Sequence, residues 1–178
     1  YLYNVTENEA TVVWVTNNDA VSWVDLAPDD GSNFYSQEWP RFFNTHIGKK
    51  AIGTLHKVTL TGLEKGTTYR YRVFSQEVTG RKNDFVTYGR VKATAVYRGK
   101  PYSFTTADKS GQKVSFAMLS DIHENNDLQK SLIAQVDMGA TDFVVFNGDM
   151  ANRLNSEEHM FAAYLQTASK LYAAETPI

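Results

Sequence analysis

The hydrophobic pattern of this chain changes near residue 108, and that change limits the folds open to it. Before this point apolar and polar residues alternate with period two, which is the pattern of half-buried β-strands. The clearest case is residues 69–73, Tyr-Arg-Tyr-Arg-Val, where the apolar side chains fall on one face and the arginines on the other. No helical period interrupts this part. The sequence therefore predicts an antiparallel β-sandwich over residues 1–108.

The individual strands of this part can be placed by the same alternation. Asn17, Asn18 and Asp19 are predicted to form a turn between the first two strands, because Asn and Asp tolerate left-handed backbone. Residues 98–101 are predicted to form another turn. The expected strands cover residues 11–16, 21–24, 55–60, 69–73, 89–97 and 102–105.

Beyond a small, polar stretch at residues 107–112, which is typical of a linker, strand and helix patterns alternate. Residues 114–119 and 143–146 are nearly continuous apolar runs, as expected of strands buried on both faces. Asn125 and Ser156 can begin the helices that follow them. The order strand, helix, strand, helix over residues 109–178 predicts the beginning of a parallel α/β domain. Two sets of apolar residues recur at helical spacing: Leu128, Leu132, Ile133 and Val136, and then Phe161, Tyr164, Leu165, Ala168 and Leu171.

Composition excludes several classes of function. Eighteen Lys and Arg against 20 Asp and Glu give a net charge of −2, which removes the electrostatic case for nucleic acid binding. The absence of cysteine excludes disulfides, thiolate metal sites and cysteine nucleophiles. No apolar run is long enough to cross a bilayer. Residues 109–178 carry 5 basic and 9 acidic residues, so this part has a carboxylate excess in which a cation could sit.

Two short motifs follow the two apolar runs of the second part. Asp121-Ile122-His123 comes after the first run and Gly148-Asp149 after the second, 28 residues after Asp121. That spacing fits one βαβ unit, whose right-handed crossover would make the two strands parallel neighbours. Ligands of open α/β sheets bind at the carboxyl ends of such strands. The sequence therefore predicts that Asp121, His123 and Asp149 form a metal site, with Gly148 where the backbone turns sharply.

Plainer interpretations exist for each of these residues. Asp121 alone could begin a helix, and Gly148-Asp149 alone could be a turn. The combination favours a metal site, because two close carboxylates repel unless a cation neutralises them. An imidazole beside two carboxylates suits Zn, Fe or Mn more than Ca.

Other residues of interest have structural interpretations as well as functional ones. We expect structural or surface roles for His46, His56 and His159 rather than metal binding. An aromatic cluster lies in a Pro- and Gly-punctuated stretch and predicts either packing against the second part of the chain or a carbohydrate or partner surface. It consists of Phe34, Tyr35, Trp39, Phe42 and Phe43.

The first part resembles a fibronectin type III domain at residues 60–69, Leu-Thr-Gly-Leu-Glu-Lys-Gly-Thr-Thr-Tyr. In that family a Leu, a turn and a Thr-x-Tyr lead into a strand, although this chain has Lys65 where a Pro is usual. The resemblance implies a tyrosine corner, in which the Tyr69 hydroxyl bonds to backbone upstream.

The second part resembles the metallophosphoesterase (calcineurin-like phosphoesterase) superfamily. Its signature begins with Asp-x-His and Gly-Asp, which match Asp121, His123, Gly148 and Asp149. A fibronectin-like domain before it is similar in architecture to the purple acid phosphatases. That group usually has Gly in place of His123, and Tyr in place of Asn152, so the tyrosinate behind the purple colour is missing.

The resemblance implies hydrolysis of phosphoesters, as a phosphatase or phosphodiesterase, by water activated between two metal ions (Fe, Zn or Mn). Asp121 and His123 would bind one ion, and Asp149 would bridge both. The superfamily's remaining motifs, including the His that acts as general acid, are expected beyond Ile178. We therefore expect this chain alone to be inactive or nearly so.

A second function remains open: an adhesive or glycan-binding β-sandwich attached to a degenerate, non-catalytic α/β part. In either case two parallel strands without a third neighbour leave an open edge. We therefore expect the rest of the domain as a second chain, or association of copies through this edge. The two-domain resemblance suggests an extracytoplasmic location.

Overall fold

The computed structural model describes residues 1–94, 100–108, 110 and 113–178. It divides into two compact units, Val5–Ala107 and a second unit made of Tyr1–Asn4 with Asp108–Ile178. The sequence places the domain boundary after residue 108. The linker expected at residues 107–112, the turn at 98–101 and the last residues of the strand at 89–97 lie partly outside the described residues. No described helix is long and apolar enough to span a membrane.

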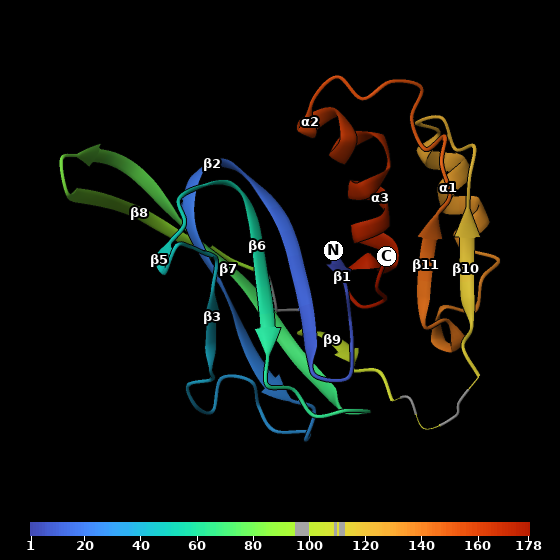
Figure 1. Cartoon of the computed structure of the whole chain (residues 1–178), viewed down its shortest axis with the longest axis horizontal. Coiled ribbons are helices and arrows are strands. Elements are labelled where there is room, and N and C mark those ends of the chain that lie inside the picture. Colours follow the sequence, from blue (N-terminus) through green and yellow to red (C-terminus); the bar gives the residue numbers. More distant parts are fainter. Residues whose placement is uncertain (95–99, 109, 111–112) are drawn as a thin grey trace. The chain divides into compact units, whose positions relative to one another are not determined.

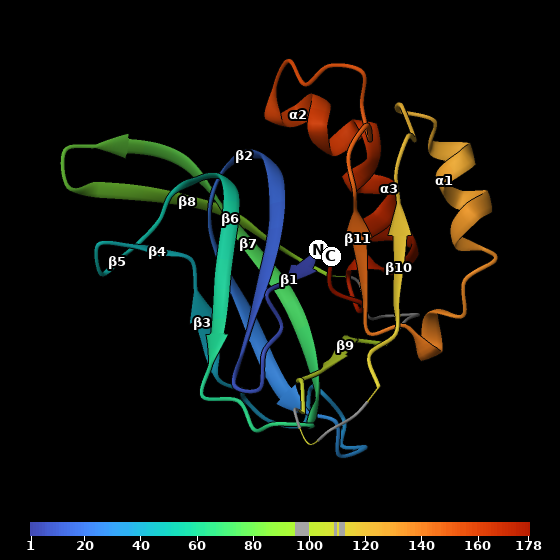
Figure 2. The ribbon, with the colours of Figure 1, turned by 45° about the vertical axis from the view of Figure 1, so that its right-hand side comes forward.

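The first unit is an antiparallel β-structure organised around one long strand, β2 (Glu9–Pro28). The first half of β2 pairs with β6 (Gly53–Thr61), and the second half pairs with β7 (Thr68–Lys82). Figures 1 and 2 show β2 curving over the top of this unit, so that its two halves belong to two layers. The remaining strands of the unit pair at the margins: β3 (Arg41–Phe43) with β2, β8 (Phe85–Ala93) and β9 (Tyr102–Thr105) with β7, and β4 (Thr45–His46) with β5 (Lys49–Lys50).

The turn predicted at Asn17, Asn18 and Asp19 is wrong, because these residues lie inside β2. The register with β6 shifts between Val15 and Ala20, so the intervening residues form a bulge that lets one strand bend from one layer to the other. Asn and Asp suit a bulge as well as a turn, and the local sequence could not separate the two.

Both layers supply the core of this unit. Val12 and Val24 come from the two halves of β2, and Val58 and Tyr71 come from β6 and β7; each is at most 2% exposed. The Tyr69 hydroxyl accepts a hydrogen bond from the backbone N–H of Glu64 at 2.9 Å. The tyrosine corner implied by the fibronectin resemblance is therefore confirmed.

The aromatic cluster packs largely within the first unit. Phe34 is buried, and the indole N–H of Trp39 donates to its carbonyl oxygen at 2.6 Å. The Arg72 guanidinium lies over Tyr35 at 5.0 Å, and Phe43 lies 5.7 Å from Trp23. These contacts all lie within the first unit, so packing against the second part of the chain stays a prediction, and Tyr35 is 59% exposed.

The second unit has the predicted order of a strand, a helix and a parallel strand. These are β10 (Phe116–Leu119), α1 (Asn126–Ile133) and β11 (Phe143–Phe146), with a short 3₁₀ turn, η1 (Met138–Ala140), before β11. β10 and β11 pair in parallel, from Phe116 opposite Phe143 to Leu119 opposite Phe146. Asn125 begins α1 as predicted, because its side-chain oxygen accepts the Leu128 N–H at 2.9 Å.

The prediction that β10 is buried on both faces is wrong. Leu119 of β10 and Val144 of β11 face a core to which α1 contributes Ile133 and the last helix contributes Tyr172. The other face carries Phe116 and Met118, which are 55% and 57% exposed. Burial of this face requires a further layer, which the described residues do not supply.

The last helix begins at α2 (Glu157–Met160), where the Ser156 hydroxyl accepts the His159 N–H at 3.0 Å. It continues through η2 (Phe161–Leu165), α3 (Gln166–Ala168) and η3 (Ser169–Ala173), of which η2 and η3 are π-helical. The wider π-helical winding changes the buried stripe predicted from α-helical spacing. Leu171, expected inside, is 46% exposed, whereas Tyr172 is buried.

The C-terminal end of the chain bonds to β11, and the N-terminal end bonds to the C-terminal residue. The Val144 N–H donates to the Pro177 carbonyl at 2.9 Å, and the Ile178 N–H donates to the carbonyl of Leu2, in β1 (Leu2–Tyr3), at 3.0 Å. The N and C labels of Figure 1 are accordingly close together. The edge of β11 is thus partly occupied by residue 177. Among the described residues, no strand pairs with the other edge of β10, which is where the expected open edge lies.

Candidate metal centre

Two loops at the carboxyl ends of β10 and β11 carry the candidate residues. Backbone hydrogen bonds join the loops: the Asp121 N–H donates to the Gly148 carbonyl at 3.3 Å, and the His123 N–H donates to the Asp149 carbonyl at 2.9 Å. The Glu124 N–H donates in the same way to Met150 at 2.9 Å. Parallel pairing of the strands therefore continues into the loops and fixes which residues face each other.

The backbone of these loops is unusual. Non-glycine residues rarely adopt positive φ, and such residues cluster where function requires a strained conformation. Gly148 has φ of 102°, and a Cβ built there would meet no atom within 4 Å. Glycine is therefore required at this position by the backbone conformation and not by a lack of space for a side chain. Four further residues have positive φ: Asp121 (56°), His123 (49°), Glu124 (66°) and Asp149 (48°).

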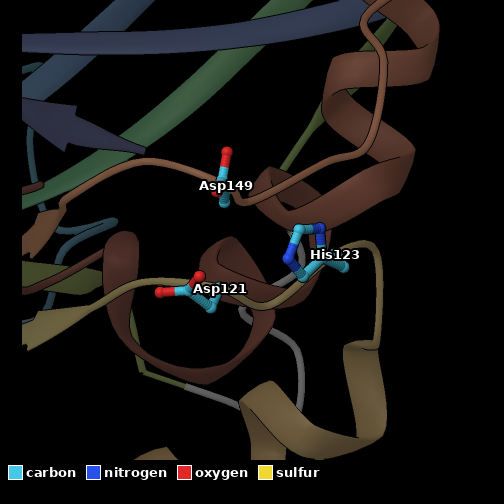
Figure 3. Close-up of side chains that lie close together, drawn as sticks. All are labelled: Asp121, His123 and Asp149. Atoms are coloured by element: carbon cyan, nitrogen blue, oxygen red, sulfur yellow. The ribbon is translucent and has the colours of Figure 1, made fainter.

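The side chains of Asp121, His123 and Asp149 converge. Each offers one ligand atom, and these atoms all lie within 4.8 Å of one another. Figure 3 shows Asp121 and His123 on one loop and Asp149 on the other. All three side chains are exposed, so an ion held there would remain open to a substrate.

The donor set is chemically suited to a transition metal. Two carboxylates this close repel each other, and a cation relieves that repulsion. Two oxygen donors with one imidazole nitrogen match Zn, Fe or Mn. The metal-binding roles of the three residues stay a prediction, since the proximity of acidic groups alone does not require an ion.

The polar contacts that Glu124 makes beside the candidate site were not predicted from the sequence. One carboxylate oxygen of Glu124 accepts the Asn152 N–H at 3.2 Å and lies 3.6 Å from Nε2 of His159. Glu124 directly follows the Asp-x-His motif, which is the one sequence signal that could have drawn attention to it. His159 lies outside the three-residue group, and its side chain is 30% exposed.

The other two histidines belong to the first unit. His46 is exposed in β4, and His56 is fully buried in β6. The Nε2 atom of His56 lies 2.9 Å from the Thr16 hydroxyl, so its role is structural.

Comparisons with known proteins agree with this architecture. A family model described as "Purple acid Phosphatase, N-terminal domain" matches residues 1–106. The structure of purple acid phosphatase PPD1 from yellow lupin (Lupinus luteus) seeds is similar, with a TM-score of 0.59 and 17% sequence identity. The similarity covers 99% of this chain and 33% of that chain, so this chain spans about a third of the lupin protein. At this identity the likeness concerns the fold. No curated protein matches this chain.

Proposed function

Because this chain belongs to the purple acid phosphatase N-terminal domain family, we propose that it forms part of a metal-dependent phosphoester hydrolase. The family match ends at residue 106, before the candidate metal centre. The observation that carries the proposal is therefore the convergence of Asp121, His123 and Asp149 at the ends of two parallel strands. The structural likeness over 99% of the chain supports it.

In the proposed enzyme, Asp121 and His123 would hold one metal ion, and Asp149 would help to hold both that ion and a second one. When bound, the ions supply a Lewis acid for the phosphoryl oxygens and a water of lowered pKa. The chain's own contribution is to hold three ligands on two hydrogen-bonded loops and to leave them exposed to substrate. We assign no general acid among the described residues.

The proposed centre differs from that of a purple enzyme. Asn152 stands where the purple acid phosphatases have the tyrosine responsible for their colour. An amide side chain cannot become a tyrosinate ligand. His123 in turn supplies a nitrogen ligand where that group usually has glycine. We therefore propose a generic metallophosphoesterase centre on a purple-acid-phosphatase-like architecture.

Removing Asp149 tests the function directly. In a protein that contains this chain together with the remaining part of its domain, we expect hydrolysis of an aryl phosphate in the presence of Mn²⁺ or Zn²⁺. Asp149→Ala should lower turnover at least about 100-fold, because it removes the proposed bridging ligand. The 178-residue chain itself should bind Mn²⁺ in calorimetry, and Asp149→Ala should abolish that binding.

The matched control is Asp127→Ala, which removes an exposed carboxylate of α1 that pairs only with Lys130 at 2.8 Å. It should leave turnover and Mn²⁺ binding unchanged. Equal turnover by the wild-type and Asp149→Ala proteins would defeat the site assignment. Loss of activity in both variants would show a general charge effect instead of a ligand role.

A further inference from the structure

Glu124 connects three segments around the candidate metal centre. Its backbone N–H donates to Met150, and its carboxylate accepts the N–H of Asn152, so it bonds twice to the loop that carries Asp149. Its side chain is about one third exposed, so these bonds are only partly shielded from water. Glu124 therefore spans the two loops immediately next to His123.

The third segment is the start of the last helix. Nδ1 of His159 accepts the Asn155 N–H at 3.5 Å. Nε2 lies 3.6 Å from the same Glu124 carboxylate oxygen that accepts the Asn152 N–H. The Ser156 hydroxyl holds the backbone of His159 at the helix start. The Nε2 side of the imidazole thus lies within ion-pair distance of the Glu124 carboxylate.

The contacts of Glu124 matter because the backbone of the candidate site is left-handed. Left-handed conformations of non-glycine residues persist only where surrounding structure holds them. Asp121, His123 and Asp149 all have φ near 50°. Glu124, with φ of 66°, contributes the last links between their two loops.

We propose that Glu124 is a positioning residue of the metal centre. Its carboxylate, oriented by His159, holds the Asp149 loop at the separation from Asp121 and His123 that one ion requires. This inference rests on the proposed function, since it needs a metal to be bound there. Glu124 is not itself among the residues whose ligand atoms converge.

The test measures Mn²⁺ binding to the 178-residue chain by calorimetry and the absorption spectrum of its Co²⁺ form. Removal of a group that orients metal ligands costs about 10–100-fold in affinity. We expect Glu124→Ala to weaken Mn²⁺ binding at least about tenfold and to change the Co²⁺ spectrum, with the melting temperature unchanged. Glu124→Gln keeps an oxygen for the Asn152 N–H and should recover most of the affinity. His159→Gln should cause a smaller loss than Glu124→Ala.

Glu158→Ala is the matched control, because it removes an exposed carboxylate in the first turn of α2. Suppose that Glu124→Ala binds Mn²⁺ with wild-type affinity and keeps the wild-type Co²⁺ spectrum, whereas Asp149→Ala no longer binds Mn²⁺. This result would overturn the positioning role of Glu124 and leave the proposed function intact. No effect in either variant would overturn the function itself. If Glu124→Ala melts several degrees lower, His159→Gln decides: an unchanged Mn²⁺ affinity and an unchanged Co²⁺ spectrum in that variant would refute the proposal.

Discussion

At the scale of single residues, His56 is the buried titratable group with the clearest physical consequence. Its side chain is fully buried; Nε2 contacts the Thr16 hydroxyl, whereas Nδ1 has no partner among the described residues. Burial disfavours the charged ring and lowers the pKa of His56 to about 4. The histidine is therefore neutral in the folded protein at neutral pH.

This pKa predicts how stability depends on pH. An unfolded histidine has a pKa of about 6.5, so between pH 6.5 and 4 the unfolded chain binds more protons than the folded one. The free energy of unfolding should therefore decrease as the pH falls through this range, by up to about 3 kcal/mol from His56 alone. Urea unfolding at pH 7 and at pH 4.5 measures this decrease in the free energy of unfolding.

The variant His56→Gln isolates this contribution, because glutamine does not titrate but can still bond the Thr16 hydroxyl. The difference in unfolding free energy between wild type and variant should shrink as the pH falls. A difference that does not change with pH for His56→Gln would contradict the prediction.

At the scale of elements, α1 packs against the last helix through two polar residues. Gln129 is fully buried, and neither polar atom of its amide is in hydrogen-bond geometry with any described residue. The Tyr172 hydroxyl beside it is also buried and lies outside hydrogen-bond geometry with every described residue. Burial raises the pKa of Tyr172 to about 12, and the neighbouring Gln129 amide offsets part of this rise. Buried polar groups without partners oppose folding. The alternation of α- and π-helical turns places Tyr172 there instead of Leu171.

Gln129→Met is therefore expected to stabilise the second unit. Methionine has a similar volume and needs no hydrogen bond, and removing an unsatisfied amide is worth about 1 kcal/mol or more. Thermal unfolding should show a melting temperature higher by a few degrees. Gln166→Met, at an exposed position of α3, should have little effect. An equal or lower melting temperature for Gln129→Met would show that the amide is satisfied in solution.

At the scale of the whole molecule, the outer face of β10 is the main uncovered apolar surface of the second unit. Val114, Phe116 and Met118 are 66%, 55% and 57% exposed, and Phe116 stacks on Phe143 at 5.3 Å. The edge of β10 away from β11 has no strand partner among the described residues. Exposed apolar residues beside an open edge favour association.

We propose that copies of this chain associate through this face and edge when no other chain covers them. Sedimentation should show dissociation on dilution, and Met118→Lys should shift the equilibrium toward monomer because it places a charge on the contact. The control is Phe85→Lys, at an 80%-exposed position in the tip of the β7–β8 hairpin. This variant should leave the association equilibrium unchanged. A wild-type chain that stays monomeric at all concentrations would contradict the proposal.

Local sequence sufficed for features that depend on near neighbours. The helix starts at Asn125 and Ser156 depend on a side chain bonding backbone a few residues away, and both were predicted. The tyrosine corner at Tyr69 likewise needs only a five-residue loop. The two acidic motifs could be placed at the ends of parallel strands, because one crossover of ordinary length brings them together.

Other features depended on what packs against each element, which no local pattern specifies. The apolar run of β10 does not show whether one face or both faces of the strand are covered. The exposure of Phe116 and Met118 therefore became known only from the way the helices pack. The left-handed backbone of Asp121, His123 and Asp149, and the contacts of Glu124 with Asn152 and His159, arise where two loops distant in sequence bond to each other. The sequence by itself thus determined which residues can form the site, through periodicity and spacing. Only the tertiary structure decided how they are held, because that depends on hydrogen bonds between segments about 30 residues apart.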